Sequence, residues 1–346
     1  MRFVFEIAHP AHVHLFRYAI VELQQHGHEV MVVSRDKDVT VELLDHYGIP
    51  HDCLSRQGRG LVGLAGEMLL RDWRLWRLAR RFRPDVFVAL SMCSAHVAAL
   101  LRKPCVIFDD SEHATLERMA WRPFATLICT PEAYRLHLGP RQRRYPGYHE
   151  LAYLHPSRFQ PDPEALTDAG IAKGERFFIV RFVSWAAAHD VGHRGFTEAG
   201  RVRLVHELEK LGRVILTSEG KVPPDLEKYR MRASPTRIHD LIAYSSLFIG
   251  DSSTMAAEAA LLGVPNIRVS TIRPGTDTER EASGVSHRID DEEEAIMKAI
   301  ELASDSSAGE RYGRLRDKLL ADKVDVTDYL VSLLEDLGAG SDQGRR

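Results

Sequence analysis

Cysteine is scarce in this sequence, and long hydrophobic runs are missing. The four cysteines, among 346 residues, form no C-x-x-C pair, which is typical of free thiols in a reducing compartment and argues against a disulfide framework or a zinc site. The longest uncharged run, Val86–Leu101, contains His96 and two serines and is too short and too polar to cross a bilayer. The chain opens on an apolar run, Arg2–Ile7, without a charged-then-apolar leader. We therefore expect a cytoplasmic protein.

Charge of one sign is not in excess either. Lysine and arginine number 46 against 49 aspartates and glutamates, so the formal net charge is −3. This balance gives no global attraction to nucleic acid, and we expect no nucleic-acid partner. Hydrophobic residues make up 44% and charged residues 27%, as in ordinary soluble proteins, and the length suits two domains.

Short apolar runs alternate with segments of helical period, which predicts parallel sheets flanked by helices. In the first half the predicted strands are Arg2–Ile7, Glu29–Ser34, Val86–Leu90, Cys105–Phe108 and Thr126–Cys129. In the second half they are Phe177–Val183, Val214–Thr217, Leu247–Ile249 and Asn266–Val269. The predicted fold class is therefore α/β, with two doubly wound, Rossmann-like domains facing a central cleft.

A stretch that contains several prolines and glycines separates the two halves and is interpreted as a linker. We predict an N-terminal domain over residues 1–155 and a linker over 156–174. A C-terminal domain with closing helices would span 175–337, and a disordered tail 338–346.

The most informative motif is IGDSSTMAAEAALLGVP, residues 249–265. A strand ends, three hydroxyl residues (Ser252, Ser253 and Thr254) follow, and a helix of small residues begins at once. Backbone N–H groups and the helix dipole at such a start attract phosphate. Glu258, one turn into the helix, is placed to accept hydrogen bonds from ribose hydroxyls. The alternative is an ordinary capped helix in which Glu258 favours the positive end.

The pattern D-S-S-T-x-x-x-E-A-x-x-L-G-V-P resembles the donor-binding segment of GT-B-fold proteins, which include non-hydrolysing UDP-N-acetylglucosamine 2-epimerases and the glycosyltransferase of peptidoglycan synthesis. The resemblance implies that Ser252, Ser253 and Thr254 hold a diphosphate and Glu258 a ribose. With the segments AHPAHVHLF, IFDDSEHA, YPGYHELAYLHP and VRFVSWAAAHDVG, the chain also resembles the family called domain of unknown function 354. The implied fold is GT-B-like, and the implied ligand is a nucleotide sugar.

An acidic cluster follows the predicted strand Cys105–Phe108. Asp110 and its neighbours Asp109, Glu112 and His113 would lie at the carboxyl end of the first sheet, where paired carboxylates and histidine supply acid–base groups. The alternative is a strand-to-helix turn with an acidic first turn. The resemblance to the epimerases makes Glu112 a candidate catalytic residue. Glu112-His113-Ala114 partly matches the H-V-E-A-G segment in which an epimerase glutamate takes part in the chemistry.

Three histidines, His9, His12 and His14, surround the first strand-to-helix turn. His9 is a candidate base or phosphate contact, and His12 either joins it or caps the helix. A metal site with the Asp110 cluster is the alternative, but H-x-x-H-x-H fits no closed ligand spacing, so we predict no metal and no cofactor.

Two further segments remain open on the sequence alone. The loop with Ser184, His189 and Asp190 either contacts the same phosphates as Ser253 or is a surface turn. The segment RDWRLWRLARRFR, residues 71–83, has six arginines and one aspartate. It predicts either a basic amphipathic helix on an anionic membrane surface, at the inner face, or a solvated helix whose tryptophans pack on the sheet.

The leading functional hypothesis is a metal-independent glycosyltransferase of GT-B type, with Glu112 or His9 as base and an unknown glycan or lipid-linked acceptor, in cell-surface glycan or glycolipid synthesis. A nucleotide-sugar 2-epimerase is the second hypothesis. Against it, Ser91, Met92 and Cys93 stand where the epimerases have a catalytic aspartate, and their T-E-R-P-E segment is only loosely matched by residues 278–281. A non-catalytic nucleotide-sugar-binding protein is the third.

Overall fold

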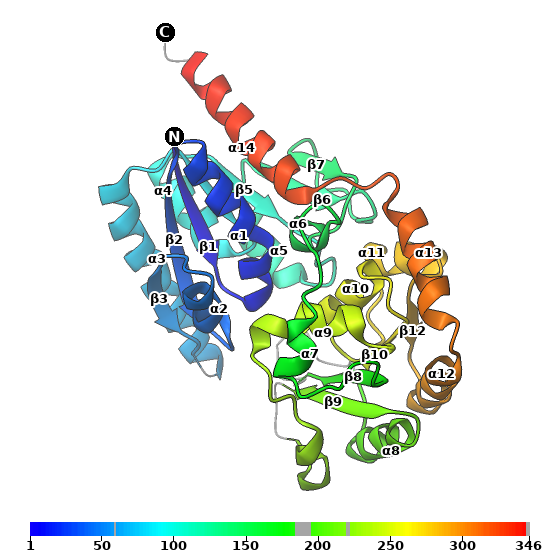
Figure 1. Cartoon of the computed structure of the whole chain (residues 1–346). Helices are drawn as coiled ribbons and strands as arrows, with labels where there is room; N and C mark the ends of the chain where they lie inside the picture. Colours follow the sequence, from blue (N-terminus) through cyan, green and yellow to red (C-terminus); the bar gives the residue numbers. More distant parts are fainter. Residues whose placement is uncertain (59, 184–194, 219–221, 344–346) are drawn as a thin grey trace. The chain divides into compact units, whose positions relative to one another are not determined.

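The computed structural model divides the chain into two compact units (Figure 1). It describes residues 1–58, 60–183, 195–218 and 222–343. Unit 1 comprises Met1–Ser157 and Val324–Arg346, and unit 2 comprises Arg158–Lys323. Both units contain a wholly parallel sheet with helices on its two faces, which confirms the predicted α/β class.

The unit 1 sheet has seven strands in the order β3-β2-β1-β4-β5-β6-β7. The strands are β1 (Arg2–Ile7), β2 (Glu29–Asp36), β3 (Asp52–Arg56), β4 (Val86–Ala89), β5 (Cys105–Phe108), β6 (Leu127–Pro131) and β7 (Gln142–Tyr145). The central strands are buried on both faces, which explains their continuous apolar runs.

Helices cover both faces of this sheet. They are α1 (Pro10–Gln25), α2 (Thr40–His46), α3 (Gly60–Phe82), α4 (Met92–Leu101), α5 (Thr115–Trp121), α6 (Leu151–Leu154) and α14 (Val326–Gln343). On one face α3, α4 and α5 share a core with the strands, through residues such as Leu75, Ala98 and Trp121. On the other face α1 packs with α2, α6 and α14, and Phe16 of α1 lies edge-on to Phe5 and Phe108.

The domain boundaries differ from those predicted. The last helix, α14, drawn in red in Figure 1, belongs to unit 1 and not to the C-terminal domain. It packs on α1 and α6, the ring of Tyr329 lies 5.1 Å from that of Tyr145, and the Thr327 hydroxyl donates to the Ala152 carbonyl. The periodic leucines of α14 predict a helix, but they do not say which sheet it covers. The helix continues to Gln343, so most of the predicted disordered tail is helical.

The unit 2 sheet has five strands in the order β12-β11-β10-β8-β9. The strands are β8 (Phe177–Phe182), β9 (Arg213–Ser218), β10 (Leu247–Gly250), β11 (Asn266–Val269) and β12 (His287–Ile289). The helices are α7 (Glu164–Asp168), α8 (Glu198–Glu209), α9 (Ile238–Tyr244), α10 (Ser253–Leu261), α11 (Gly275–Ala282), α12 (Glu292–Ser304) and α13 (Ala308–Leu320), with 3₁₀ turns η1 (Pro224–Tyr229) and η2 (Pro235–Arg237).

The helices of unit 2 also form two layers. One core, which includes Leu204 of α8 and Ile296 of α12, covers one sheet face, and a second, which includes Leu241 of α9 and Ala259 of α10, covers the other. The predicted linker is part of this second core, because Ala165 and Ile171 are buried in it. Residues 158–174 are therefore folded onto unit 2. No helix of the described residues is long and apolar enough to cross a membrane.

Candidate functional site

The start of α10 lies at the carboxyl end of β10, the middle strand of the unit 2 sheet. β10 ends at Gly250, where a Cβ atom would collide with the carbonyl oxygen of Arg181 on β8, so the close strand approach requires glycine. Ser252 then adopts an extended conformation and caps the helix, because its hydroxyl accepts the Met255 N–H at 3.4 Å. The predicted strand, turn and helix are thus all present.

The first turn of α10 leaves hydrogen-bond donors for a ligand. The N–H groups of the first helical residues, Ser253 and Thr254, have no partner within the helix. Their hydroxyls also make no hydrogen bond within the described part of the chain, and both residues are partly exposed. Because these donors coincide with the positive end of the helix dipole, the arrangement suits a phosphate group.

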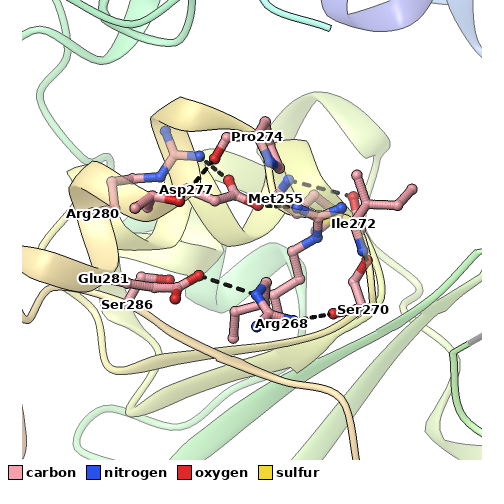
Figure 2. A network of polar contacts seen from close by, with 12 residues as sticks. Met255, Arg268, Ser270, Ile272, Pro274, Asp277, Arg280, Glu281 and Ser286 are labelled. Carbon is pink, nitrogen blue, oxygen red and sulfur yellow. Dashed lines mark hydrogen bonds and ion pairs between the residues drawn. The ribbon is translucent and has the colours of Figure 1, made fainter. Parts of the chain in front are cut away.

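Two arginines flank the strand end that leads into α10. In the sheet register Gly250 lies between Arg181 of β8 and Arg268 of β11. Arg268 belongs to a buried network in which it and Arg280 both donate to Asp277, and Figure 2 draws Met255 of α10 among these residues. Burial lowers the pKa of Arg268 despite Asp277.

A second arm of the same network is centred on Arg288 of β12. Its guanidinium pairs with Asp290, lies 3.3 Å from Glu281 and donates to the carbonyl of Ser270 at 2.6 Å. These contacts fix the carbonyl of Ser270 at the start of the loop that follows β11. This arginine network was not predicted from the sequence. The signal that was present is Arg268 inside the otherwise apolar strand β11.

Glu258 is engaged differently from the prediction. Its side chain is 3% exposed, and its Oε1 lies 3.0 Å from Nε2 of His239 on α9. In this conformation the carboxylate presents almost no surface to a ligand, so a ribose contact would require the pair with His239 to open. The ribose role of Glu258 stays a prediction. The loop residues Ser184, His189 and Asp190 lie outside the described residues.

In unit 1, the histidines of the first turn lie at the carboxyl end of β1. His9 is the N-cap of α1, and its Nδ1 accepts the Ala11 N–H at 3.2 Å. His12 points back, and its Nδ1 accepts the Ala8 N–H at 3.3 Å. Burial, and then the neighbouring His9 and Lys37, lower the pKa of His12 well below its usual value and favour the neutral ring.

A histidine that the sequence analysis did not single out completes this cluster. His149 follows β7, is 7% exposed, and places its Nδ1 3.2 Å from Oδ2 of Asp110. Burial opposes the charge, but Asp110 prevails and raises the pKa of His149. Its Nε2 has no hydrogen-bond partner among the described residues. His12 and His149 are close enough to influence each other's charge, so two neighbouring imidazoles have pKa values shifted in opposite directions.

The other acidic residues of the cluster, Asp109 and Glu112, make hydrogen bonds of their own. Asp109 is buried and accepts hydrogen bonds from the Tyr134 hydroxyl at 2.6 Å and the Ser111 N–H, and burial nevertheless raises its pKa. Glu112 accepts the N–H of Arg135 at 2.9 Å through Oε1. The structure thus brings His9, His12 and Asp110 together, whereas Glu112 is hydrogen-bonded to Arg135 in the loop after β6. No group of three metal-ligating side chains is found among the described residues.

Comparison with known proteins places the chain in a family. The model of the family described as protein of unknown function DUF354 matches residues 2–326. The chain belongs to the DUF354 family. A curated relative, the uncharacterized protein MJ0665 of Methanocaldococcus jannaschii, is 23% identical over 277 residues, which cover 76% of this DUF354 chain and 80% of the relative.

Two solved structures illustrate the fold of this DUF354 protein. The glycosyltransferase SsfS6 of Streptomyces sp. SF2575, complexed with thymidine diphosphate, superposes with a TM-score of 0.64 at 16% identity and covers 97% of this chain and 99% of its own. The UDP-GlcNAc 2-epimerase of Methanocaldococcus jannaschii gives a TM-score of 0.62 at 12% identity, with coverage of 91% and 99%. At such identities the likeness shows the fold, which is GT-B-like, and leaves the reaction open.

Proposed function

We propose that this DUF354 protein is a metal-independent glycosyltransferase that uses a nucleotide sugar as donor and a glycan or lipid-linked hydroxyl compound as acceptor. The observation that carries the proposal is the first turn of α10. There the N–H groups of Ser253 and Thr254 have no partner within the helix, their hydroxyls make no hydrogen bond within the described residues, and Arg181 and Arg268 flank the preceding strand end. A diphosphate is complementary to these donors in charge and can accept their hydrogen bonds. The complex of SsfS6 with thymidine diphosphate supports the same ligand class on the same fold.

In the proposed reaction the bond between the anomeric carbon and the diphosphate oxygen breaks, and a bond to the acceptor oxygen forms. The nucleoside diphosphate leaves with the bonding electrons, and the donors of α10 stabilise the charge that develops on it. The acceptor hydroxyl must lose a proton to a base. We assign that base to Asp110, whose side chain is 34% exposed, with the buried His149 behind it as the group that orients the carboxylate.

Glu112 is the competing base, through its resemblance to the epimerase glutamate. Asp110→Asn and Glu112→Gln separate the two, because both replacements preserve side-chain volume and remove one carboxylate. The proposal predicts that Asp110→Asn abolishes transfer and retains nucleotide affinity, whereas Glu112→Gln retains measurable transfer. Full activity of Asp110→Asn, with loss only in Glu112→Gln, would move the base to Glu112.

The test of the function itself is a thermal-shift screen with UDP-, GDP-, CDP- and dTDP-sugars, followed by turnover assays with the stabilising donor. A bound donor at about 100 times its dissociation constant adds roughly 2.7 kcal/mol of stability. Acceptor-dependent release of nucleoside diphosphate supports the transferase. An isomeric nucleotide sugar formed without acceptor would support the epimerase, as the fold of the archaeal epimerase allows. Binding without turnover would leave a non-catalytic binding protein.

A further inference from the structure

Large apolar side chains are exposed on one layer of helices in unit 1. Eleven large hydrophobic side chains are exposed among the described residues, and eight of them lie between Leu64 and Phe124. The most exposed of the eight are Leu69 and Trp73 on α3, Leu100 on α4, and Leu116 and Met119 on α5. Single exposed hydrophobic residues are ordinary, whereas a concentration on one layer indicates a contact surface.

The three helices present their outward sides in a common direction. α3 packs against α4 and α4 against α5, and all three cover the same face of the sheet. His96 of α4 ties the layer together, because Nδ1 lies 2.9 Å from Asp72 of α3 and Nε2 lies 3.3 Å from the carbonyl oxygen of Ala120 on α5. We call the exposed residues of α3, α4 and α5 the α3–α5 face.

The α3–α5 face is cationic as well as apolar. On α3 the exposed residues recur at helical spacing, with Leu69, Leu70 and Trp73 in the first part and four arginines, at positions 74, 77, 80 and 81, in the second. Arg71 does not contribute, because it is buried and paired with Glu6. Glu117 is the one exposed acidic residue in the described stretch 60–124.

We infer that the α3–α5 face binds an anionic lipid surface, with the apolar side chains in the interface and the arginines against the headgroups. The combination favours lipid over other occupants. A second copy of the chain, paired by a twofold axis, would bury this cationic face against the same cationic face of its partner. An RNA would use the arginines but give Leu116 and Met119 no role. The inference goes beyond the proposed function and does not depend on it.

The test measures partition of the full-length protein onto vesicles of phosphatidylcholine with and without phosphatidylglycerol. We expect sedimentation with the anionic vesicles, little with the neutral ones, and a decrease as salt rises. Emission of the half-exposed Trp73 should shift to shorter wavelength on binding and fail to do so in Trp73→Phe. The double variant Arg77→Gln/Arg81→Gln should bind about thirtyfold more weakly, since each arginine contributes about 1 kcal/mol, or about fivefold in affinity.

Two comparisons make the test decisive. The control Lys173→Gln/Arg232→Gln removes the same charge from exposed sites of unit 2 and should bind like the wild type. Leu69→Ser/Trp73→Ser should weaken binding while melting at the wild-type temperature. The inference is overturned if no vesicle binds, if the control loses as much as the α3 pair, or if neutral vesicles bind equally. It is also overturned if Leu69→Ser/Trp73→Ser changes only the self-association of the protein. The same holds if this variant binds both RNA and anionic vesicles as the wild type does.

Discussion

Replacing Glu258 by glutamine tests what this buried carboxylate does. The side chain is 3% exposed and its Oε1 lies 3.0 Å from Nε2 of His239, so glutamine keeps the volume and loses the charge. Hydrogen bonds that involve a charged group contribute about 1.5–3 kcal/mol, and we expect the free energy of unfolding to fall by roughly that amount. For a domain of this size that corresponds to a decrease in Tm of about 3–12 °C.

The assay is thermal and urea unfolding of Glu258→Gln, His239→Asn and the double variant, so that the cycle isolates the coupling between the two side chains. Additive single effects would refute the buried pair. Calorimetry on the folded Glu258→Gln protein then tests the ribose contact separately. A loss of about 1.5–3 kcal/mol in nucleotide affinity would support that contact. Unchanged affinity would remove the ribose role and leave Glu258 a structural residue.

Further predictions concern the buried charges of unit 1. Because the pKa of His149 is raised in the folded state, its interaction with Asp110 stabilises the fold fully below about pH 6.5. This contribution is lost as pH rises through the folded-state pKa. The stability difference between wild type and His149→Gln, measured by urea unfolding, should therefore shrink from acid to alkaline pH. His12 has the opposite sign: its lowered pKa costs stability as pH falls below about 6.5, and urea unfolding of His12→Asn should lack this loss. Glu6→Gln should cost roughly 3–5 kcal/mol in the same assay, because it leaves Arg71 buried without its partner, and a loss below about 1 kcal/mol would contradict the pairing.

The central strands were predictable from the sequence, whereas three of the four edge strands were not; the fourth, β9, was predicted as Val214–Thr217. β1, β5 and β11 have the predicted bounds, because strands buried on both faces show as continuous apolar runs. The three missed strands, β3, β7 and β12, all lie at sheet edges, where QRRY and HRI are as polar as loops.

The site shows the same division between local and distant contacts. The start of α10 was predicted because a cap, hydroxyl residues and small residues follow one another in the chain. His149 was missed because its partner Asp110 is distant in sequence and one histidine after a short polar strand gives no periodic signal. The pair of His239 and Glu258 was missed for the same reason, since it joins two helices.

The most direct test of the phosphate site is Ser253→Asp, compared with Ser253→Ala. Ser253 is the first helical residue of α10 and is partly exposed. An aspartate there favours the positive end of the helix, so the fold should be as stable as in the wild type. The added charge would repel a diphosphate, and calorimetry with TDP and UDP should show at least about tenfold weaker binding, or about 1.4 kcal/mol, for Ser253→Asp than for Ser253→Ala. Equal nucleotide affinity in the two variants would contradict a diphosphate site at α10.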